Sequence, residues 1–534
     1  WPITVATTIL KPGGYNRLIQ MCEKVEGMPF KAFAGTDSAA ISDLSTASHT
    51  NWHHTKSIKP MPERKSDKKV PLIDCFTAPC KGGCPIEQDI PEYIELCRKG
   101  LYGPALKLIT EKNALPFITG TICAHRCQNK CTRNFYEESV QIRDTKLEAA
   151  KKGYNALMAS IRKPAPVAGK KVAIIGGGPT GIAAAYFLGR AGIATTIFER
   201  ENQLGGVPRH VIPAFRISDE AIDKDVALMM QYGVEVKLGA PAPSVDELKS
   251  MGYTHILFAV GAWKAGELGI EGNVAGVIGW MKEMKGKVKP CLSGDVVVVG
   301  AGNTAMDAAR VAKRMGARST IVYRRTKKYM PADEHELQLA IDEGVNFVEL
   351  AAPVKQADGK LLLNVMKLGE PDASGRRSPV ATGETMEIPC DLVISAIGEK
   401  VDSDLLKANG IEVDSKGRPA FETNVAGVYA AGDATRGPAT VVEGIADAAK
   451  FAEIVIGEAH TYEIPEAAYV TKAEAIAKKA TLHCSACACC EGSRCVDCNT
   501  VCENCTDSCP NRANVVIKLA DGRHEIVHID KMCN

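Results

Sequence analysis

The sequence is poor in aromatic residues and carries almost no net charge. Of its 534 residues, 5% are aromatic and 24% are charged, and 65 basic side chains nearly balance 63 acidic ones. A strongly basic nucleic-acid-binding chain or a mostly disordered chain would have a different composition, so both classes are excluded. The hydrophobic fraction of 45% is that of an ordinary globular protein. The length corresponds to about three or four domains.

Long hydrophobic runs are also missing. The most apolar stretch, 172–198, is interrupted by Gly176, Gly177, Gly178, Pro179 and Gly181, so we expect no transmembrane helix. The basic run 56–69 has no interleaved aromatic residues, and we interpret it as solvated linker rather than as a nucleic-acid patch. The first four residues include no Met and no basic group, and we expect them to lie inside a longer chain.

Cysteine is nearly absent from the middle of the chain and dense at both ends. Residues 132–483 hold only Cys291 and Cys390, whereas eight of the 20 cysteines lie at or before Cys131 and ten lie at or after Cys484. A disulfide-stapled secreted protein would be small and rich in cysteine throughout. We therefore interpret the clustered cysteines as metal ligands, and we predict a cytoplasmic protein because such thiols need a reducing compartment.

A dinucleotide-binding motif begins at Val172. A hydrophobic run leads into Gly176, Gly178, Pro179 and Gly181, and a helical pattern follows. In this motif the glycines permit the tight turn, the approach of a pyrophosphate to the helix N-terminus, and close packing of helix on strand. The next predicted strand ends at Glu199, 18 residues after Gly181, where a carboxylate can accept hydrogen bonds from a ribose.

The same pattern recurs at Val296. Four valines lead into Gly300, Gly302, Asn303, Thr304 and Ala305, with Ala in place of the third glycine. The following strand ends in Arg324 and Arg325 rather than in an acid, and a guanidinium suits a 2′-phosphate. This favours NADP over NAD, although an exposed surface pair of arginines is the alternative. Strand and helix patterns alternate through this region, which predicts an α/β fold.

Together these motifs resemble the flavin-dependent pyridine nucleotide-disulfide oxidoreductases. More narrowly, residues 71–460 are similar to the glutamate synthase small subunit and to the N-terminal part of dihydropyrimidine dehydrogenase. The resemblance implies two interleaved Rossmann-like domains, FAD at the first motif and NAD(P)H at the second. The cofactor-binding residues that it and the motifs indicate are Gly176, Gly178, Pro179, Gly181, Glu199, Arg200, Gly206, Arg216, Gly261, Gly432 and Asp433 for FAD, and Gly300, Gly302, Asn303, Thr304, Ala305, Arg324 and Arg325 for NAD(P)H. No side chain is expected to act as a catalytic acid or base, because hydride transfer takes place on the cofactors.

The resemblance also predicts a domain order. We expect the end of a preceding flavin barrel-like domain at 1–30, a linker at 31–70, a helical iron–sulfur domain at 71–165, the first part of the FAD domain at 166–285, the NAD(P)H domain at 286–398, the second part of the FAD domain at 399–462, and a ferredoxin-like iron–sulfur segment at 463–534 that is cut off in its second half.

The N-terminal cysteines have the spacing of cluster ligands. Thiolates bind iron in cubane clusters, and a run that ends in Cys-Pro is typical of bacterial ferredoxins. By the family pattern, Cys75, Cys80 and Cys131 serve one [4Fe–4S] cluster, and Cys84, Cys123 and Cys127 serve the other. The family's remaining ligands fall at Leu72 and near Lys146, neither of which binds iron. Either each cluster lacks a fourth protein ligand, or one is absent or has three irons; Asp74, His125 and Glu148 are the candidate substitutes.

The C-terminal cysteines resemble half of a two-cluster ferredoxin. We predict as metal ligands Cys484, Cys487, Cys495, Cys498, Cys502, Cys505, Cys509 and Cys533. Zinc is the competing interpretation for Cys484–Cys498, because paired CxxC motifs also form four-thiolate zinc sites. The Cys-Pro pair and the neighbouring flavin domain favour iron–sulfur clusters.

The whole arrangement predicts an NAD(P)H:acceptor oxidoreductase that relays electrons between NADPH, FAD and [4Fe–4S] clusters. It most resembles proteins described as selenate reductase iron–sulfur subunits. This implies a redox partner subunit, such as a molybdenum hydroxylase, within a larger complex, and neither a nucleic-acid nor a membrane partner. Two alternatives are a glutamate-synthase-type small subunit and a non-catalytic scaffold with structural clusters.

Overall fold

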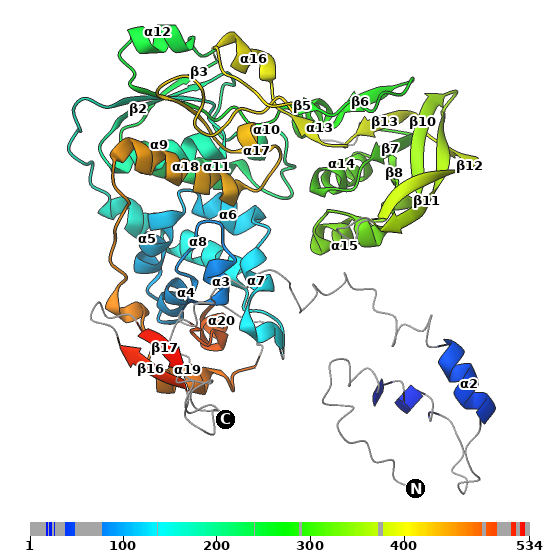
Figure 1. The fold of residues 1–534 in the computed structure, drawn as a ribbon, viewed down its shortest axis with the longest axis horizontal. Coiled ribbons are helices and arrows are strands. Elements are labelled where there is room, and N and C mark those ends of the chain that lie inside the picture. Colours follow the sequence, from blue (N-terminus) through cyan, green and yellow to red (C-terminus); the bar gives the residue numbers. More distant parts are fainter. Residues whose placement is uncertain are drawn as a thin grey trace, which may run out of the picture. The chain divides into compact units, whose positions relative to one another are not determined.

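The structure is a computed structural model, shown in Figure 1. It describes residues 18–19, 21–23, 26, 38–47, 77–135, 137–239, 241–287, 291–371, 377–482, 488–498, 514–518 and 524–528. The chain divides into two compact units, residues 1–72 with 326–330 and residues 73–325 with 331–534. In the first unit, a ten-residue helix, α2 (Ser38–Ala47), lies within the stretch predicted to be linker.

The second unit begins with a helical region. Proline occupies the first turn of α3, α4 and α6, where its missing N–H is not needed. Helices α5 and α8 approach closely because Gly153 has no side chain; a Cβ there would lie 2.3 Å from the Tyr102 carbonyl oxygen. The elements are α3 (Pro79–Gly82), α4 (Ile90–Arg98), α5 (Tyr102–Lys112), α6 (Pro116–Ile122), α7 (Arg126–Asn129), η1 (Thr132–Phe135) and α8 (Ile142–Ser160).

A parallel five-stranded sheet follows, in the order β15-β4-β1-β2-β3. Strand β15 pairs with β4 although the two are far apart in the sequence, so the chain leaves this sheet and returns to it. The sheet and its helices comprise β1 (Lys171–Ile175), α9 (Pro179–Arg190), β2 (Ala194–Glu199), α10 (Gly206–His210), α11 (Asp219–Met230), β3 (Glu235–Leu238), α12 (Val245–Ser250), β4 (His255–Phe258), α16 (Ser403–Ala408), β15 (Val428–Ala430), α17 (Asp433–Arg436) and α18 (Val441–Ile456).

The intervening chain forms a second parallel sheet, in the order β6-β13-β7-β8-β9. A short antiparallel pair, β5 (Lys264–Ala265) with β14 (Glu399–Lys400), lies where the chain passes between the sheets. The second sheet and its helices comprise β6 (Val274–Gly276), α13 (Val277–Lys285), β7 (Asp295–Val299), α14 (Asn303–Arg314), β8 (Arg318–Tyr323), α15 (Glu334–Asp342), β9 (Asn346–Glu349) and β13 (Leu392–Ser395). The short helix η2 (Lys327–Tyr329) belongs to the first unit. The predicted α/β fold with two interleaved Rossmann-like sheets is confirmed.

An antiparallel sheet of β10 (Ala351–Ala357), β11 (Lys360–Pro371) and β12 (Arg377–Pro389) follows β9 and was not predicted. The alternation of strand and helix patterns concealed it. A local signal was present, because Asp358-Gly359 between two apolar runs is a favoured hairpin turn. Both residues have positive φ, 52° and 71°, as such a turn requires.

The C-terminal segment returns to the helical region. It contains η3 (Glu466–Ala468), α19 (Lys472–Lys478), α20 (Ala488–Arg494) and an antiparallel hairpin of β16 (Asn514–Lys518) with β17 (His524–His528). Helix α20 packs against α4, as Figure 1 also shows. Gly492 permits this approach, since a Cβ there would lie 2.5 Å from Cβ of Arg98. Across all the ranges described, no helix is long and apolar enough to cross a membrane.

Two fully buried arginines fix the C-terminal segment in place. The Arg133 guanidinium, on η1, donates hydrogen bonds to the carbonyl oxygens of Lys478 (2.6 Å), Thr481 (2.7 Å) and Arg494 (2.7 Å). Arg494 pairs with Glu491 (2.7 Å) and donates to the carbonyl oxygen of Glu138 (2.5 Å). Such buried charges are tolerated because each is met by several acceptors.

We expect Arg133→Met to loosen the C-terminal segment. The substitution leaves three carbonyl acceptors without their donor and should weaken docking by about 3 kcal/mol or more. Limited proteolysis should then cut between residues 478 and 498 far faster than in the native protein. Arg162→Met, at an exposed arginine that donates only to its own segment, is the matched control; equal cleavage of both variants would contradict the docking role.

Candidate functional site

The first glycine-rich turn joins β1 to α9. Gly176 has φ of +107°, and a Cβ on Gly181 would lie 2.0 Å from the Gly176 carbonyl oxygen. Gly206, with φ of +57°, lies so close that its own Cβ would be 2.7 Å from Cα of Gly178. The turn therefore presents bare backbone at the start of α9, which begins at Pro179. A backbone cradle of this kind fits a dinucleotide pyrophosphate.

Glu199 lies behind this turn, at the end of β2. Its Oε2 accepts a hydrogen bond from the Gly177 N–H (2.6 Å), and its Oε1 accepts one from the Glu201 N–H (2.9 Å). The Glu199 carboxylate thus anchors the glycine-rich turn through Gly177. Its predicted role as a ribose ligand stays a prediction. The neighbouring Arg200 is exposed, with its guanidinium carbon 5.1 Å from the ring centroid of Trp263.

The Gly432-Asp433 pair lies beside the first turn. Gly432 follows β15 with φ of +69°, and a Cβ on it would lie 2.4 Å from Oγ1 of Thr180, on α9. The Asp433 carboxylate accepts a hydrogen bond from the Ala439 N–H (3.1 Å). Burial, with a smaller contribution from the neighbouring carboxylate of Glu399, raises the pKa of Asp433 to about 7. Gly261, after β4, also has positive φ, at 68°.

Arg216, which the resemblance assigns to the FAD site, forms two ion pairs in this structure. Its guanidinium pairs with Asp307 (2.8 Å), on α14, and with Glu336 (2.7 Å), on α15. Both carboxylates are buried, and burial raises the pKa of Asp307 to about 6 even beside Arg216. Arg216 therefore balances the charge of these two carboxylates, and its ion pairs connect the region of the first sheet to helices of the second.

The second glycine-rich turn joins β7 to α14. Gly300 has φ of +148°, and a Cβ there would lie 2.3 Å from the Ala396 carbonyl oxygen. A Cβ on Gly302 would meet no atom within 4 Å, so there is open space in front of α14. Asn303 accepts a hydrogen bond from the Asp333 N–H (2.9 Å), and Thr304 donates one to Glu399 (3.2 Å). Ala305 is buried, and the open helix N-terminus fits a phosphate group.

The two arginines at the end of β8 differ in their surroundings. Arg324 is exposed. Arg325 is buried, and its Nε donates a hydrogen bond to the carbonyl oxygen of Arg377 (3.0 Å). Arg325 thus connects β8 to β12, and Arg324 is the better placed of the pair to meet a 2′-phosphate.

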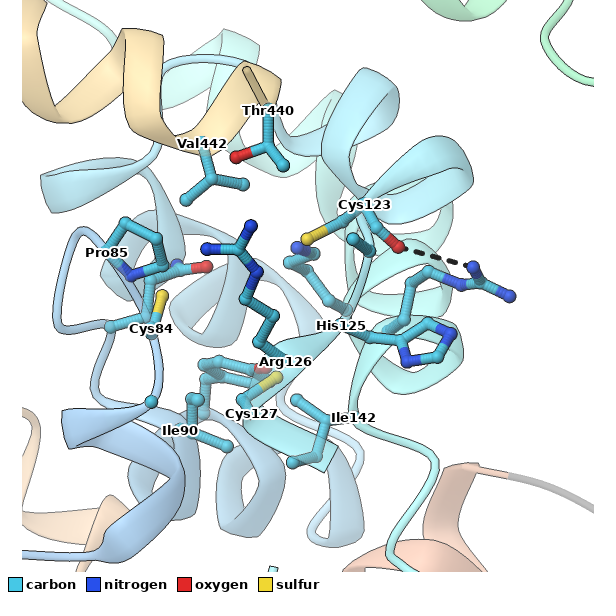
Figure 2. Close-up of a pocket in the computed structure, with 16 residues that line it drawn as sticks. Cys84, Pro85, Ile90, Cys123, His125, Arg126, Cys127, Ile142, Thr440 and Val442 are labelled. Atoms are coloured by element: carbon cyan, nitrogen blue, oxygen red, sulfur yellow. Dashed lines mark hydrogen bonds between the residues drawn. The ribbon is translucent and has the colours of Figure 1, made fainter. Parts of the chain in front are cut away.

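Three of the predicted cysteines line one cavity, which we call cavity 1. Figure 2 shows the sulfur atoms of Cys84, Cys123 and Cys127 facing the same space, with Thr440 and Val442 of the α18 N-terminus above it. The side chain of Arg126 reaches across this space. Burial raises the pKa of Cys127 to about 12. Buried thiols of this kind are costly to ionise unless cations compensate, as the irons of a cluster do.

The fourth position of cavity 1 differs from the family pattern. Lys146 is buried and lines the cavity. Burial raises the pKa values of Cys84 and Cys127, and the positive charge of Lys146 offsets part of that rise. His125, one of the three candidate substitutes, also lines the cavity, and its buried Nδ1 has no hydrogen-bond partner among the described residues.

The other two substitutes are less suitable. Glu148 accepts hydrogen bonds from Tyr102 (3.1 Å) and Lys152 (2.5 Å) instead of lining the cavity. Asp74 lies outside the described residues.

A second cavity, cavity 2, was not predicted as a unit. Four cysteines line it: Cys80, Cys131, Cys495 and Cys498. The first two had been grouped with Cys75, which lies outside the described residues, and the other two with a separate C-terminal cluster. Burial raises the pKa of Cys80 well above its usual value, and the nearby Cys498, Cys127 and Cys131 thiolates raise it further.

The two cavities adjoin, because Ile90 and Ile142 line both. Within the described ranges, no three His, Cys, Asp or Glu side chains converge closely enough to hold one metal ion. A single zinc would need its thiolates at about 2.3 Å from one point, whereas in a cubane each thiolate binds a different iron. The remaining predicted ligands, Cys484, Cys487, Cys502, Cys505, Cys509 and Cys533, lie outside the described residues.

We expect Gly206→Ala to lower the FAD content of the purified protein. The added Cβ meets Gly178 backbone from a positive-φ position, and the strain, about 1–3 kcal/mol, distorts the cradle. Flavin released per chain should fall roughly tenfold at limiting FAD. Gly279→Ala, where a Cβ meets no atom within 4 Å, should keep its flavin; full flavin in both variants would show that the close approach is not needed.

Comparison with known proteins agrees with this geometry. Residues 170–448 match the pyridine nucleotide-disulphide oxidoreductase family, residues 65–155 match dihydropyrimidine dehydrogenase domain II with its 4Fe-4S cluster, and residues 1–56 match the N-terminal TIM-barrel domain of oxidoreductase YgfK.

Three relatives illustrate the range of the similarity. The oxidoreductase YgfK of Escherichia coli K12 is 39% identical over 100% of this chain and 54% of its own length. The NADPH-Fe(3+) oxidoreductase subunit beta of Geobacter sulfurreducens is 35% identical over 72% of this chain and 64% of its own. The glutamate synthase [NADPH] small chain of E. coli K12 is 31% identical over 71% and 88%.

The chain spans about half the length of YgfK. The matched family covers more than half of the chain, and it covers both glycine-rich turns described above. The chain therefore belongs to the pyridine nucleotide-disulphide oxidoreductase family, and it is an oxidoreductase of the kind that uses FAD, a nicotinamide nucleotide and iron–sulfur clusters.

Proposed function

We propose that this chain relays electrons between NADPH and a redox partner by way of FAD and two adjacent iron–sulfur clusters. The observation that carries the proposal is the position of cavity 1. It touches the N-terminus of α18 through Thr440 and Val442, and it shares Ile90 and Ile142 with cavity 2. When bound, these groups would supply hydride transfer from nicotinamide, division of the electron pair at the flavin, and one-electron transfer at the clusters.

The residues around this path would bind the cofactors and keep water away from them. The two glycine-rich turns hold the phosphates, and Glu199 keeps the first turn in shape. The wall that the cavities share is apolar and almost fully buried, with Ile90 and Ile142 at 2% and 3% exposure. Tyr93 of cavity 1 is 1% exposed. Such a wall keeps water from the cluster sites and lowers the local dielectric constant, which tunes redox potential.

The partner belongs to the same proposal. We propose a separate redox subunit, such as a molybdenum hydroxylase of the selenate reductase type, and a cytoplasmic location. Support comes from relatives whose names describe subunits, including the NADP(+)-dependent formate dehydrogenase subunit beta of Moorella thermoacetica. Cavity 2 takes two of its cysteines from the segment after residue 463, which favours a relay extending beyond the flavin region over a glutamate-synthase-type small subunit.

Anaerobic titration of the holoprotein with NADPH tests this relay. Flavin absorbance should bleach, and electron paramagnetic resonance of the same sample should show reduced clusters. If NADPH and NADH both leave the flavin oxidised, the relay is wrong and a scaffold with structural clusters becomes the better account.

Arg324→Ala should weaken NADPH binding by about 10- to 150-fold and leave NADH binding nearly unchanged. The exposed guanidinium at the end of β8 is expected to meet the 2′-phosphate, and one charge-assisted hydrogen bond contributes about 1.5–3 kcal/mol. Dissociation constants from flavin-monitored titrations measure the effect. Arg318→Ala, at the opposite end of the same strand and paired with Asp295, is the control; an equal loss for both nucleotides would refute the assignment.

A further inference from the structure

We propose that cavity 2 holds one [4Fe–4S] cluster whose ligands come from the two ends of the described chain. Cys80 and Cys131 belong to the N-terminal helical region, and Cys495 and Cys498 belong to the C-terminal segment. The proposal deepens the relay proposed above and rests on it for the redox use of the cluster. The test below counts iron and maps ligands without any nucleotide, so that either proposal can fail alone.

The described residues around cavity 2 supply enough thiolates for one [4Fe–4S] cluster. A cubane cluster has four irons that each take one protein ligand, and four thiolates are its usual complement. The N-terminal cysteines alone do not provide this set, because Leu72 replaces one ligand of the family pattern. Cys495 and Cys498 bring the cysteines around cavity 2 to four, and all four face the same cavity.

Local structure aims these cysteines into the cavity. Cys80 follows Pro79 in the first turn of α3, and Cys131 directly precedes η1. Cys495 comes immediately after the end of α20. Thr132, the residue after Cys131, places its Oγ1 3.1 Å from Sγ of Cys498. The residue next to Cys131 is thus in direct contact with the sulfur atom of Cys498.

Buried charges hold the Cys495–Cys498 turn in this position. Arg494, just before it, is anchored by Arg133. Asp497, inside it, has φ of +48° and pairs with Lys478 (2.6 Å), which also pairs with Glu95 of α4 (2.7 Å). A left-handed aspartate is uncommon and persists where its surroundings require it. The Cys495–Cys498 turn is therefore anchored before Cys495, through Arg494, and again between the two cysteines, through Asp497.

The cavity is otherwise suited to a cluster. Ile90, Ile94, Val140 and Ile142 line it, all buried. Apolar walls limit solvent access to the irons. The site therefore has the four soft thiolate ligands and the dry surroundings that a cubane requires.

Iron and sulfide counts on anaerobically purified full-length variants test the ligand set. We expect Cys131→Ser, the pair Cys495→Ser/Cys498→Ser, and the triple combination to lose the same irons, about four per chain. Cys97→Ala, at a buried cysteine of α4 that lines neither cavity, should keep full iron. A triple variant that loses about eight irons would overturn the shared site. Loss in Cys75→Ser with retention in Cys495→Ser/Cys498→Ser would overturn it as well.

A second measurement needs no variant and is therefore independent of folding defects. Clusters are stripped stepwise from the native holoprotein with an iron chelator, and newly exposed thiols are alkylated and identified by mass spectrometry. Cys80, Cys131, Cys495 and Cys498 should become reactive in parallel. If Cys495 and Cys498 react while Cys80 and Cys131 stay protected, they belong to a different cluster and the proposal is wrong.

Discussion

The cluster region depends on the burial of charged side chains between the two ends of the described chain. Arg133, Arg494, Lys478 and Asp497 are almost completely removed from solvent. Arg133 donates to the Arg494 carbonyl oxygen, Arg494 donates to the Glu138 carbonyl oxygen, and Lys478 joins Asp497 to Glu95 of α4. Burying one of these charges alone would cost several kcal/mol, so the network is stable only when the C-terminal segment is docked. Docking then brings Cys495 and Cys498 to Cys80 and Cys131. The pairing of these charges thus stabilises the docked segment, and the docked segment completes the lining of cavity 2.

A second constraint governs the two nucleotide sites. Both glycine-rich turns need bare backbone because carbonyl oxygens lie within 2.5 Å of where a Cβ would sit. The Arg216 ion pairs with Asp307 and Glu336 connect the regions that carry these turns. Steric fit thus shapes each site, and electrostatics connects one site to the other. Thr440 and Val442 in turn connect the first site to cavity 1.

The sequence predicted the elements that local patterns determine and missed those that depend on distant partners. Strand β1 and helix α9 lie where the sequence predicted them, because a hydrophobic run, a glycine-rich turn and a helical pattern define them locally. No local sequence pattern indicates that Cys495 and Cys80 line the same cavity. Their proximity depends on hydrogen bonds between residues more than 300 positions apart. The ion pairs of Arg216 with Asp307 and Glu336 also lack a local signature, because their partners lie about 90 and 120 positions away in the sequence. The Asp358-Gly359 turn was a readable signal of the antiparallel sheet.

Anomalous diffraction at the iron edge, from crystals of the anaerobically purified protein, tests the central claim most directly. The account predicts one iron peak in each cavity, with the second peak in contact with Cys131 and Cys495 alike. An iron peak beside Cys495 that is separate from Cys80 and Cys131, or an empty cavity 2 in protein with full iron, would contradict it.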